Sequence, residues 1–395
     1  MEKYDIICIG SGVSALYFGY KLLKSNSKKR VLFITKDEAP GGTIKSKKAD
    51  EFYWERCASR YFKKEHKLLN NLIEDLKIPT IDAKINVVTK TYDDVIERIY
   101  NVYGSDETVN FPNAVLTLYD SNILNKVVLS LGKDIFRQNF NLYAFFENST
   151  SPDHETKLKY GFQSLCNILF EKVTCKYEYI MNHQVNDITI CEMDHCNKFL
   201  IDGKWLCNKI VFTGTSNQFN NLNCDILTER KELINDLFVP VLGYKCYLQF
   251  NEPWWDNCRD IFDGHPILNS MQYYSYNTIL IYNAGSTSTV LQSFDDDTLI
   301  EYILSQIPCI ISLDPNATQP TDKQLNSISK MWNVNNIQEI LLSPKALNKC
   351  DENIYSKIIA NDNFYFLSGN FMAKGGGWVN TNFEVVEEYF DEIVC

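Results

Sequence analysis

The chain has 395 residues, of which 45% are hydrophobic and 23% are charged, and its formal net charge is −11 at pH 7. This composition is typical of a globular protein with a large core, and the negative charge argues against nucleic acid and anionic membranes as partners. No uncharged apolar run reaches about 18 residues, so no membrane span is expected.

The 13 cysteines lack the spacing of a disulfide framework and favour reduced thiols. Cys191, His195 and Cys196 lack a second half-site, so no metal is expected.

The opening residues predict a strand, a glycine turn and a helix. Residues 4–9 (YDIICI) have the pattern of a short buried strand, and residues 10–15 (GSGVSA) follow it directly and open a helix that runs to about Leu23. G-x-G-x-x-A between a strand and a helix brings backbone amides to a dinucleotide pyrophosphate. Gly10 permits the tight turn, and Gly12 removes the side chain that would block the phosphates. The alternative is a Gly-rich hairpin turn, which fits the flanking strand and helix less well.

The second strand is expected over residues 30–34, ending at Thr35. An acidic residue normally ends this strand and binds the adenosine ribose. Thr35 can accept one hydrogen bond, so we expect weaker cofactor binding, by about 1–3 kcal/mol. Asp37 and Glu38 follow two and three positions later, and residues 40–42 (PGG) form a second Gly-rich turn.

The rest of the chain alternates between helical and strand patterns. Helical spacing occurs at residues 66–76, 162–170, 297–306 and 381–393, and strand patterns at residues 177–180, 187–192, 198–201, 209–213, 244–250, 273–283 and 363–367. The segment 92–160 carries no phosphate motif and is predicted to be a mostly helical insertion. The run 209–213, followed by Gly214, is expected to return to the nucleotide-binding sheet.

These patterns predict an α/β fold class with discontinuous domains. A dinucleotide-binding, Rossmann-like domain is assembled from residues 1–50, 161–238 and 346–395. An α+β substrate-binding domain combines residues 51–91 with 239–345, and residues 92–160 form the insertion.

With the first strand starting at Tyr4 there is no room for a signal peptide, so a cytoplasmic protein is expected. The amino-acid composition resembles that of proteins encoded by AT-rich genomes. If the genome is viral, the expected compartment is the host cytoplasm.

Four segments in order resemble the flavin-dependent amine oxidase family, with the closest likeness to its L-amino-acid oxidases and monoamine oxidases. They are residues 31–46, with the turn Gly41-Gly42-Thr43-Ile44-Lys45-Ser46; residues 55–60 (ERCASR); residues 238–255; and residues 364–369 (FYFLSG) with 377–379 (GWV). The resemblance covers residues 1–80, about 160–255 and 361–395. Thr43 replaces an arginine of the family pattern, Cys57 a glycine, and Asn370 an aspartate or glutamate.

The resemblance implies that the Rossmann-like domain binds FAD. The family's covalent flavin cysteine has no counterpart, so the FAD should be non-covalent. Thr35, Thr43 and Asn370 stand where the family has charged residues, which lowers the expected affinity. The cofactor-binding residues implied by the motifs are Gly10, Gly12, Val13, Ser14, Ala15, Thr35, Lys36, Gly41, Gly42, Thr43, Val185, Gly214, Gly369, Asn370, Gly377, Trp378 and Val379.

The resemblance also implies the reaction: an FAD-dependent oxidoreductase acting on CH–NH2 or CH–NH groups of an L-amino acid or another amine. Hydride passes from the amine α-carbon to flavin N5, the imine is hydrolysed, and O2 reoxidises the flavin to give H2O2. Lys245 matches the lysine that holds a water beneath N5. Trp378 matches an aromatic wall beside the flavin, and Arg60 matches the clamp for a substrate carboxylate.

Each catalytic assignment has a plainer alternative. Lys245 could point to solvent from an alternating strand, and Trp378 could be a core residue. Arg56, one turn away, could replace Arg60 as the clamp, or Arg60 could form a surface ion pair.

Two other functions stay open. One is a diverged flavin-binding protein of the same fold without turnover, favoured by Thr35, Thr43 and Asn370. The other is FAD-dependent oxidation of a non-amine substrate. The expected partners are a small amine or amino acid and O2, with a homodimer as a candidate assembly and neither nucleic acid nor membrane.

Overall fold

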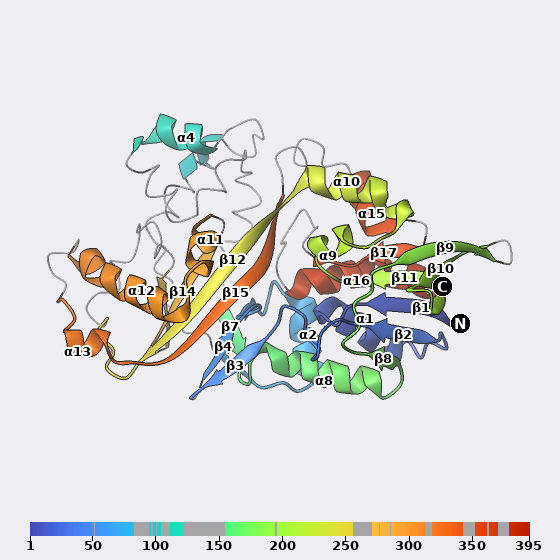
Figure 1. The fold of residues 1–395 in the computed structure, drawn as a ribbon, viewed down its shortest axis with the longest axis horizontal. Helices are drawn as coiled ribbons and strands as arrows, with labels where there is room; N and C mark the ends of the chain where they lie inside the picture. The colour runs from blue at the N-terminus through green and yellow to red at the C-terminus, as the bar shows by residue number, and fades with distance from the viewer. Residues whose placement is uncertain are drawn as a thin grey trace. The chain divides into compact units, whose positions relative to one another are not determined.

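The computed structural model forms two compact units (Figure 1). It describes residues 1–50, 52–82, 95, 98–99, 101–103, 111–121, 123, 155–193, 196–255, 271–275, 277–284, 286–312, 318–342, 352–361, 363–369 and 379–395. Unit 1 comprises Met1–Ala83, Ser151–Val239 and Asn348–Cys395, and unit 2 comprises Lys84–Thr150 and Pro240–Leu347. Contacts thus group residues 51–83 with the N-terminal segment. A substrate-binding role for any segment stays a prediction.

Unit 1 is built on a mostly parallel sheet. Its main path runs β16-β17-β11-β1-β2-β8, with β1 Glu2–Ile9, β2 Val31–Ile34, β8 Glu178–Ile180, β11 Trp205–Phe212, β16 Ala360–Asn361 and β17 Phe364–Phe366. Every pair on this path is parallel except β16 with β17. A hairpin of β9 (Ile188–Met193) and β10 (Cys196–Ile201) adds antiparallel to the start of β11. The parallel sheet confirms the predicted α/β class.

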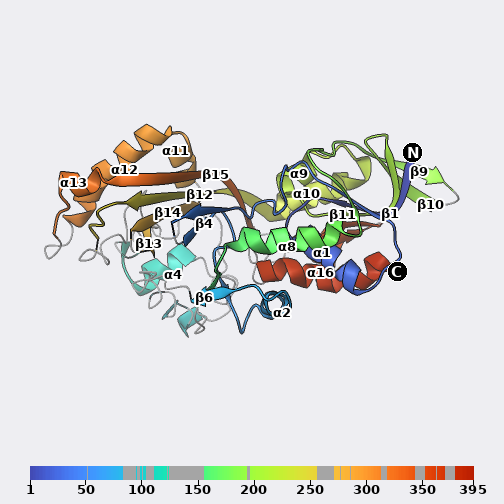
Figure 2. The same cartoon turned by 90° about the horizontal axis from the view of Figure 1, so that it is seen from below.

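Helices cover both faces of this sheet. On one face lie α1 (Val13–Lys24), α8 (Phe162–Thr174) and α16 (Val379–Val394), with α2 (Lys67–Asp75) against α16 (Figure 2). Gly19 lets α1 approach α8, since a Cβ there would lie 2.7 Å from Val173 Cγ1. The other face carries α9 (Ser216–Asn220), η1 (Asp225–Leu227), α10 (Thr228–Leu237) and α15 (Glu352–Ile359). There Phe219 stacks on Phe366 at 4.6 Å between ring centroids. Two covered faces explain the continuous apolar runs of β1 and β2.

A short sheet corrects the expectation for residues 92–160. Its order is β5-β7-β6, with β5 Tyr61–Phe62, β6 Thr80–Asp82 and β7 Glu155–Leu158. The end of the predicted helical insertion is therefore a strand paired to two earlier segments. Within the same stretch, α4 (Phe111–Leu118) is helical as expected.

Side chains from a neighbouring hairpin cap α8. The hairpin pairs β3 (Ser46–Ala49) with β4 (Phe52–Glu55), and Gly161 at the N-cap of α8 offers no side chain. Glu55 Oε1 accepts from the Phe162 amide at 2.9 Å, and Ser46 Oγ accepts from the Gln163 amide at 3.0 Å. A carboxylate at a helix N-terminus is stabilising, so Glu55 of the ERCASR segment has a structural role.

Unit 2 contains a four-stranded sheet of order β13-β14-β12-β15. Its strands are β12 Phe238–Phe250, β13 Met271–Ser275, β14 Thr278–Ala284 and β15 Ile328–Leu342. The single strand predicted over 273–283 is wrong, because β13 and β14 form an antiparallel hairpin. Helices α11 (Ser286–Gln292) and α12 (Asp296–Ile311) pack on one face through Leu291, Leu299 and Ile303.

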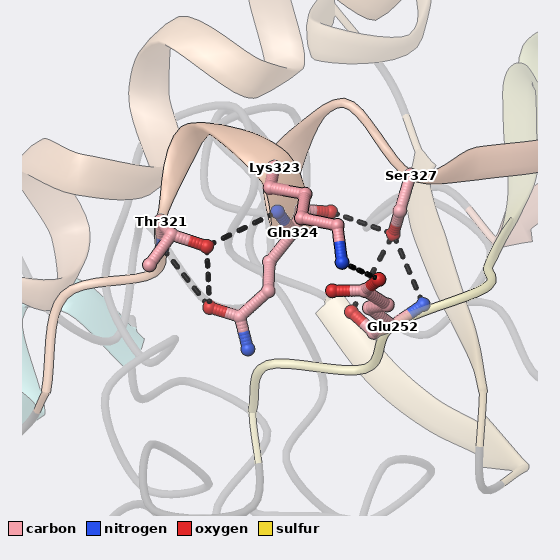
Figure 3. Close-up of polar contacts among 5 residues, drawn as sticks. All are labelled: Glu252, Thr321, Lys323, Gln324 and Ser327. Atoms are coloured by element: carbon pink, nitrogen blue, oxygen red, sulfur yellow. Dashed lines mark hydrogen bonds and ion pairs between the residues drawn. The ribbon is translucent and has the colours of Figure 1, made fainter.

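A polar cluster fastens the end of β12 to the start of β15 (Figure 3). Thr321 and Gln324 form a reciprocal capping box on α13 (Asp322–Leu325). Ser327 Oγ accepts from the Glu252 amide at 3.1 Å, and the Lys323 ammonium pairs with the Glu252 carboxylate. These contacts give Glu252 a structural role. Among the described helices, none combines the length and apolarity that a bilayer crossing requires.

Candidate functional site

The turn between β1 and α1 leaves helix amides without acceptors from a side-chain cap. Gly12 is the N-cap, in extended geometry (φ −68°, ψ 176°), and no side chain caps the helix. The first helical bond runs from the Leu16 amide to the Gly12 carbonyl at 3.1 Å. The amides of Val13, Ser14 and Ala15 precede it and so have no partner within the helix. Such a terminus attracts anions.

The two glycines of this turn have different roles. Gly10 has φ +127°, and a Cβ there would lie 2.3 Å from Thr213 Oγ1, so glycine is required to bring the ends of β1 and β11 together. A Cβ at Gly12 would meet no heavy atom within 4 Å. Open space therefore adjoins the helix N-terminus at the point where a pyrophosphate would lie, and the cradle fits a dinucleotide.

The second glycine turn lies against the first. The Gly41 amide donates to the Ser11 carbonyl at 2.7 Å. Gly42 has φ +60°, and a Cβ there would lie 3.2 Å from Gly12 Cα. Lys36 and Thr43, two of the predicted cofactor residues, have exposed side chains near these turns.

The carboxylate at the end of β2 belongs to Asp37. The Thr35 side chain is 3% exposed, and its Oγ1 donates to Ser11 Oγ at 3.0 Å. Ser11 Oγ donates in turn to Asp37 Oδ2 at 3.2 Å, and the Asp37 amide donates to Thr35 Oγ1 at 3.2 Å. Thr35 and Ser11 thus anchor a half-buried carboxylate two residues beyond the expected position. The sequence pattern assigns Asp37 no role, because its hydrogen bond with Ser11 appears only in the folded chain.

Other predicted cofactor residues follow the carboxyl ends of parallel strands, where ligands bind in open α/β sheets. Gly214 lies just after β11, and a Cβ there would be 2.6 Å from Phe212 Cζ. Val185 is 7% exposed in the segment between β8 and β9. Val379 begins α16. Asn370, Gly377 and Trp378 fall outside the described residues.

The closing segment meets the first helix through Asn382. Gly369, after β17, donates its amide to Asn382 Oδ1 at 3.0 Å. The Ser14 hydroxyl donates to the same oxygen at 2.9 Å. Asn382 was not predicted, because nothing local in α16 indicates a contact with Ser14.

Lys245 lies in unit 2 on the sheet face opposite the helices. Its neighbours on the other face, Tyr244 and Cys246, belong to the helix-packed core. Lys245 is 7% exposed, and its Nζ lies 5.0 Å from the ring centroid of Tyr282, directly across on β14. On the same face, Tyr247 stacks on Trp332. The alternative of a solvent-exposed lysine is therefore wrong.

Arg60 is half-buried between β4 and β5 in unit 1, near Arg56. The Arg56 amide donates to the Lys45 carbonyl at 2.8 Å. Across the described part of the chain, no group of three or more His, Cys, Asp or Glu residues could hold a metal.

Residues 8–76 match the family described as an NAD(P)-binding Rossmann-like domain. Many solved structures also match, and three of them that align nearly end to end illustrate the likeness. A putrescine oxidase double mutant redesigned in cofactor binding is 12% identical, with 100% of this chain and 99% of that chain covered and a TM-score of 0.74. The wild type bound to putrescine is 13% identical, with 99% of both chains covered and a TM-score of 0.75.

A cyclohexylamine oxidase from Brevibacterium oxydans IH-35A is 11% identical, with 99% of this chain and 98% of that chain covered and a TM-score of 0.74. No curated protein sequence matches. The chain therefore has the fold of these amine oxidases, which confirms the likeness and the fold class inferred from the motifs.

Proposed function

We propose that this protein is an FAD-dependent oxidase of an L-amino acid or another amine, releasing H2O2. The observation that supports it most is the cradle at Gly12: helix amides of α1 beside open space. It stands at the carboxyl edge of the parallel sheet, in a chain that has the fold of amine oxidases along its whole length.

The residues present suit a non-covalent dinucleotide. The amides of Val13, Ser14 and Ala15 would hold the diphosphate, and the Asp37 carboxylate would accept from ribose hydroxyls. When bound, FAD supplies a ring that accepts a hydride from the amine. The chain supplies binding, orientation and exclusion of water.

Three side chains would serve the substrate. Lys245, buried and carrying up to three N–H donors, would hold the water that hydrolyses the imine. Arg60 would bind a substrate carboxylate through two donors. Trp378 would exclude water from the reacting carbon.

Freshly purified protein tests the proposal directly. We expect a yellow protein with flavin absorbance that releases FAD, identified by mass spectrometry, on denaturation. A peroxide-coupled screen over amino acids and polyamines should then find a substrate. Colourless protein that FAD does not reconstitute would overturn the proposal.

A flavin-binding protein without turnover is the second candidate. It is favoured by Thr43, whose exposed hydroxyl stands where the family pattern has an arginine, and by Thr35, whose hydroxyl is engaged by Ser11. Bound FAD that no amine reduces under anaerobic conditions would favour this candidate. Reduction by a non-amine compound alone would instead indicate oxidation of a different substrate class.

Arg60→Ala is expected to raise KM for carboxylate-bearing substrates alone. Losing a two-donor contact to a carboxylate costs about 1.5–3 kcal/mol, or roughly 10- to 150-fold in affinity. Simple amines should keep their KM. Steady-state kinetics on an amino acid and on its decarboxylated amine measure the difference. The same selective loss in Arg56→Ala, with Arg60→Ala unaffected, would assign the clamp to Arg56 instead. An equal effect on both substrates would reject the clamp.

Asp37→Ala is expected to weaken binding of FAD and ADP-ribose by roughly 5- to 100-fold, since a charged acceptor for ribose hydroxyls is lost. Calorimetry with ADP-ribose isolates the effect from turnover. Glu38→Ala, an exposed acid one position along, should bind as the wild type does. Equal affinities for all three proteins would show that Asp37 does not contact the ribose.

A further inference from the structure

One asparagine joins the first and last pieces of the candidate dinucleotide site. Asn382 lies in the first turns of α16, and its Oδ1 accepts two hydrogen bonds, from Ser14 Oγ at 2.9 Å and from the Gly369 amide at 3.0 Å. The packing there is tight: a Cβ on Gly369 would lie 2.7 Å from the Asn382 backbone nitrogen. The end of β17 and the first turn of α1 are therefore held on a single side-chain oxygen.

We propose that Asn382 is a positioning residue for the dinucleotide, an inference that rests on the proposed function. The only hydroxyl proton of Ser14 is donated to Asn382, so Ser14 can offer a diphosphate its backbone N–H but no hydroxyl donor. That amide points correctly only while the first turn of α1 stays fixed. Asn382 fixes it by tying Ser14 to Gly369, which the chain supplies more than 350 residues later.

The amide side chain suits this place better than a carboxylate. A carboxylate at position 382 could accept the same two hydrogen bonds, and charged acceptors form the stronger ones. It would also put a negative charge beside the amides that are to receive a diphosphate. Asparagine keeps the link and leaves the cradle free of that repulsion.

The same helix carries a matched control. Asn380 is 3% exposed, accepts from the Leu69 amide at 3.0 Å through Oδ1, and donates to Glu384 at 2.6 Å through Nδ2. It therefore fixes α2 rather than the glycine turn. Its loss should lower stability through the same chemistry without touching the cradle.

Asn382→Asp, Asn382→Ala and Asn380→Ala separate positioning from stability. The readouts are the melting temperature of the FAD-free protein and the dissociation constants of FAD and ADP at two salt concentrations. Asn382→Asp should melt near the wild type yet bind both nucleotides at least about tenfold more weakly, a loss that salt reduces by screening. Asn382→Ala should lose both stability and affinity. Asn380→Ala should lose stability alone.

The outcomes are distinct. Wild-type affinity in both Asn382 variants would overturn the inference while leaving the proposed function standing. The same holds if Asn380→Ala loses affinity as strongly as Asn382→Ala, because a general loss of packing would then explain both. Wild-type protein that binds neither FAD nor ADP would overturn the proposed function together with this inference.

Discussion

Gly12→Val is expected to weaken FAD binding strongly while the FAD-free protein melts near the wild-type temperature. Gly12 has an ordinary extended backbone, and a Cβ there would meet no heavy atom within 4 Å, so the folded chain has room for a Cβ at this position. The valine methyl groups would instead occupy the space in front of the α1 amides. A diphosphate would lose its contact with the helix N-terminus, and we expect at least about a 100-fold loss of affinity, or roughly 3 kcal/mol.

The neighbouring glycine supplies the control for this experiment. Gly10→Ala puts a Cβ at φ +127° and 2.3 Å from Thr213 Oγ1, so it should lower the melting temperature of the FAD-free protein. Titration of FAD against intrinsic fluorescence and thermal melts measure both variants. If Gly12→Val protein binds FAD as tightly as the wild type, the turn does not hold the diphosphate.

The sequence predicted the local parts of the site well, because their signals lie within a few residues of each other. The run YDIICI, the glycine turn and the following helix appear as β1 and α1 with ends shifted by one or two residues. The fold class followed from alternating strands and helices, and the parallel sheet confirms it.

Contacts between distant segments were not predictable in the same way. β7 pairs with β5 and β6, and nothing in residues 155–158 distinguishes an edge of a helical insertion from a short strand. The hairpin of β13 and β14 was missed because an aromatic-rich run continued through the turn. Its register shift near Tyr273 and Ser275 further weakened the alternation.

The site shows the same division between local and distant signals. An acid normally ends the second strand of such a fold, where this chain has Thr35. The carboxylate that accepts from the Ser11 hydroxyl belongs to Asp37, two residues later. Loop geometry decides that outcome, and hydrophobic patterning carries no information about it. Asn382 depends on tertiary packing alone, because its two donors come from the two ends of the chain.

For Lys245, alternation along β12 showed that it faces away from Tyr244 and Cys246 but not which face is packed against helices. The structure adds that Lys245 is buried beside the ring of Tyr282. An ammonium held in such a place is costly unless it is paired or used. The burial excludes a solvent-exposed lysine, and the role of Lys245 beside the flavin stays a prediction.

Lys245→Met is therefore expected to slow amine oxidation by at least about 100-fold, the usual contribution of a positioned proton donor or acceptor, while FAD stays bound. Methionine has a similar length and can fill the same space in the strand, so the folded structure should be retained. Lys330→Met removes an exposed lysine from β15 of the same sheet and should leave turnover unchanged. Stopped-flow measurement of flavin reduction and reoxidation locates the affected step. Wild-type rates in both half-reactions would show that Lys245 is a packing residue, whereas loss of FAD from the variant would place it in cofactor binding instead.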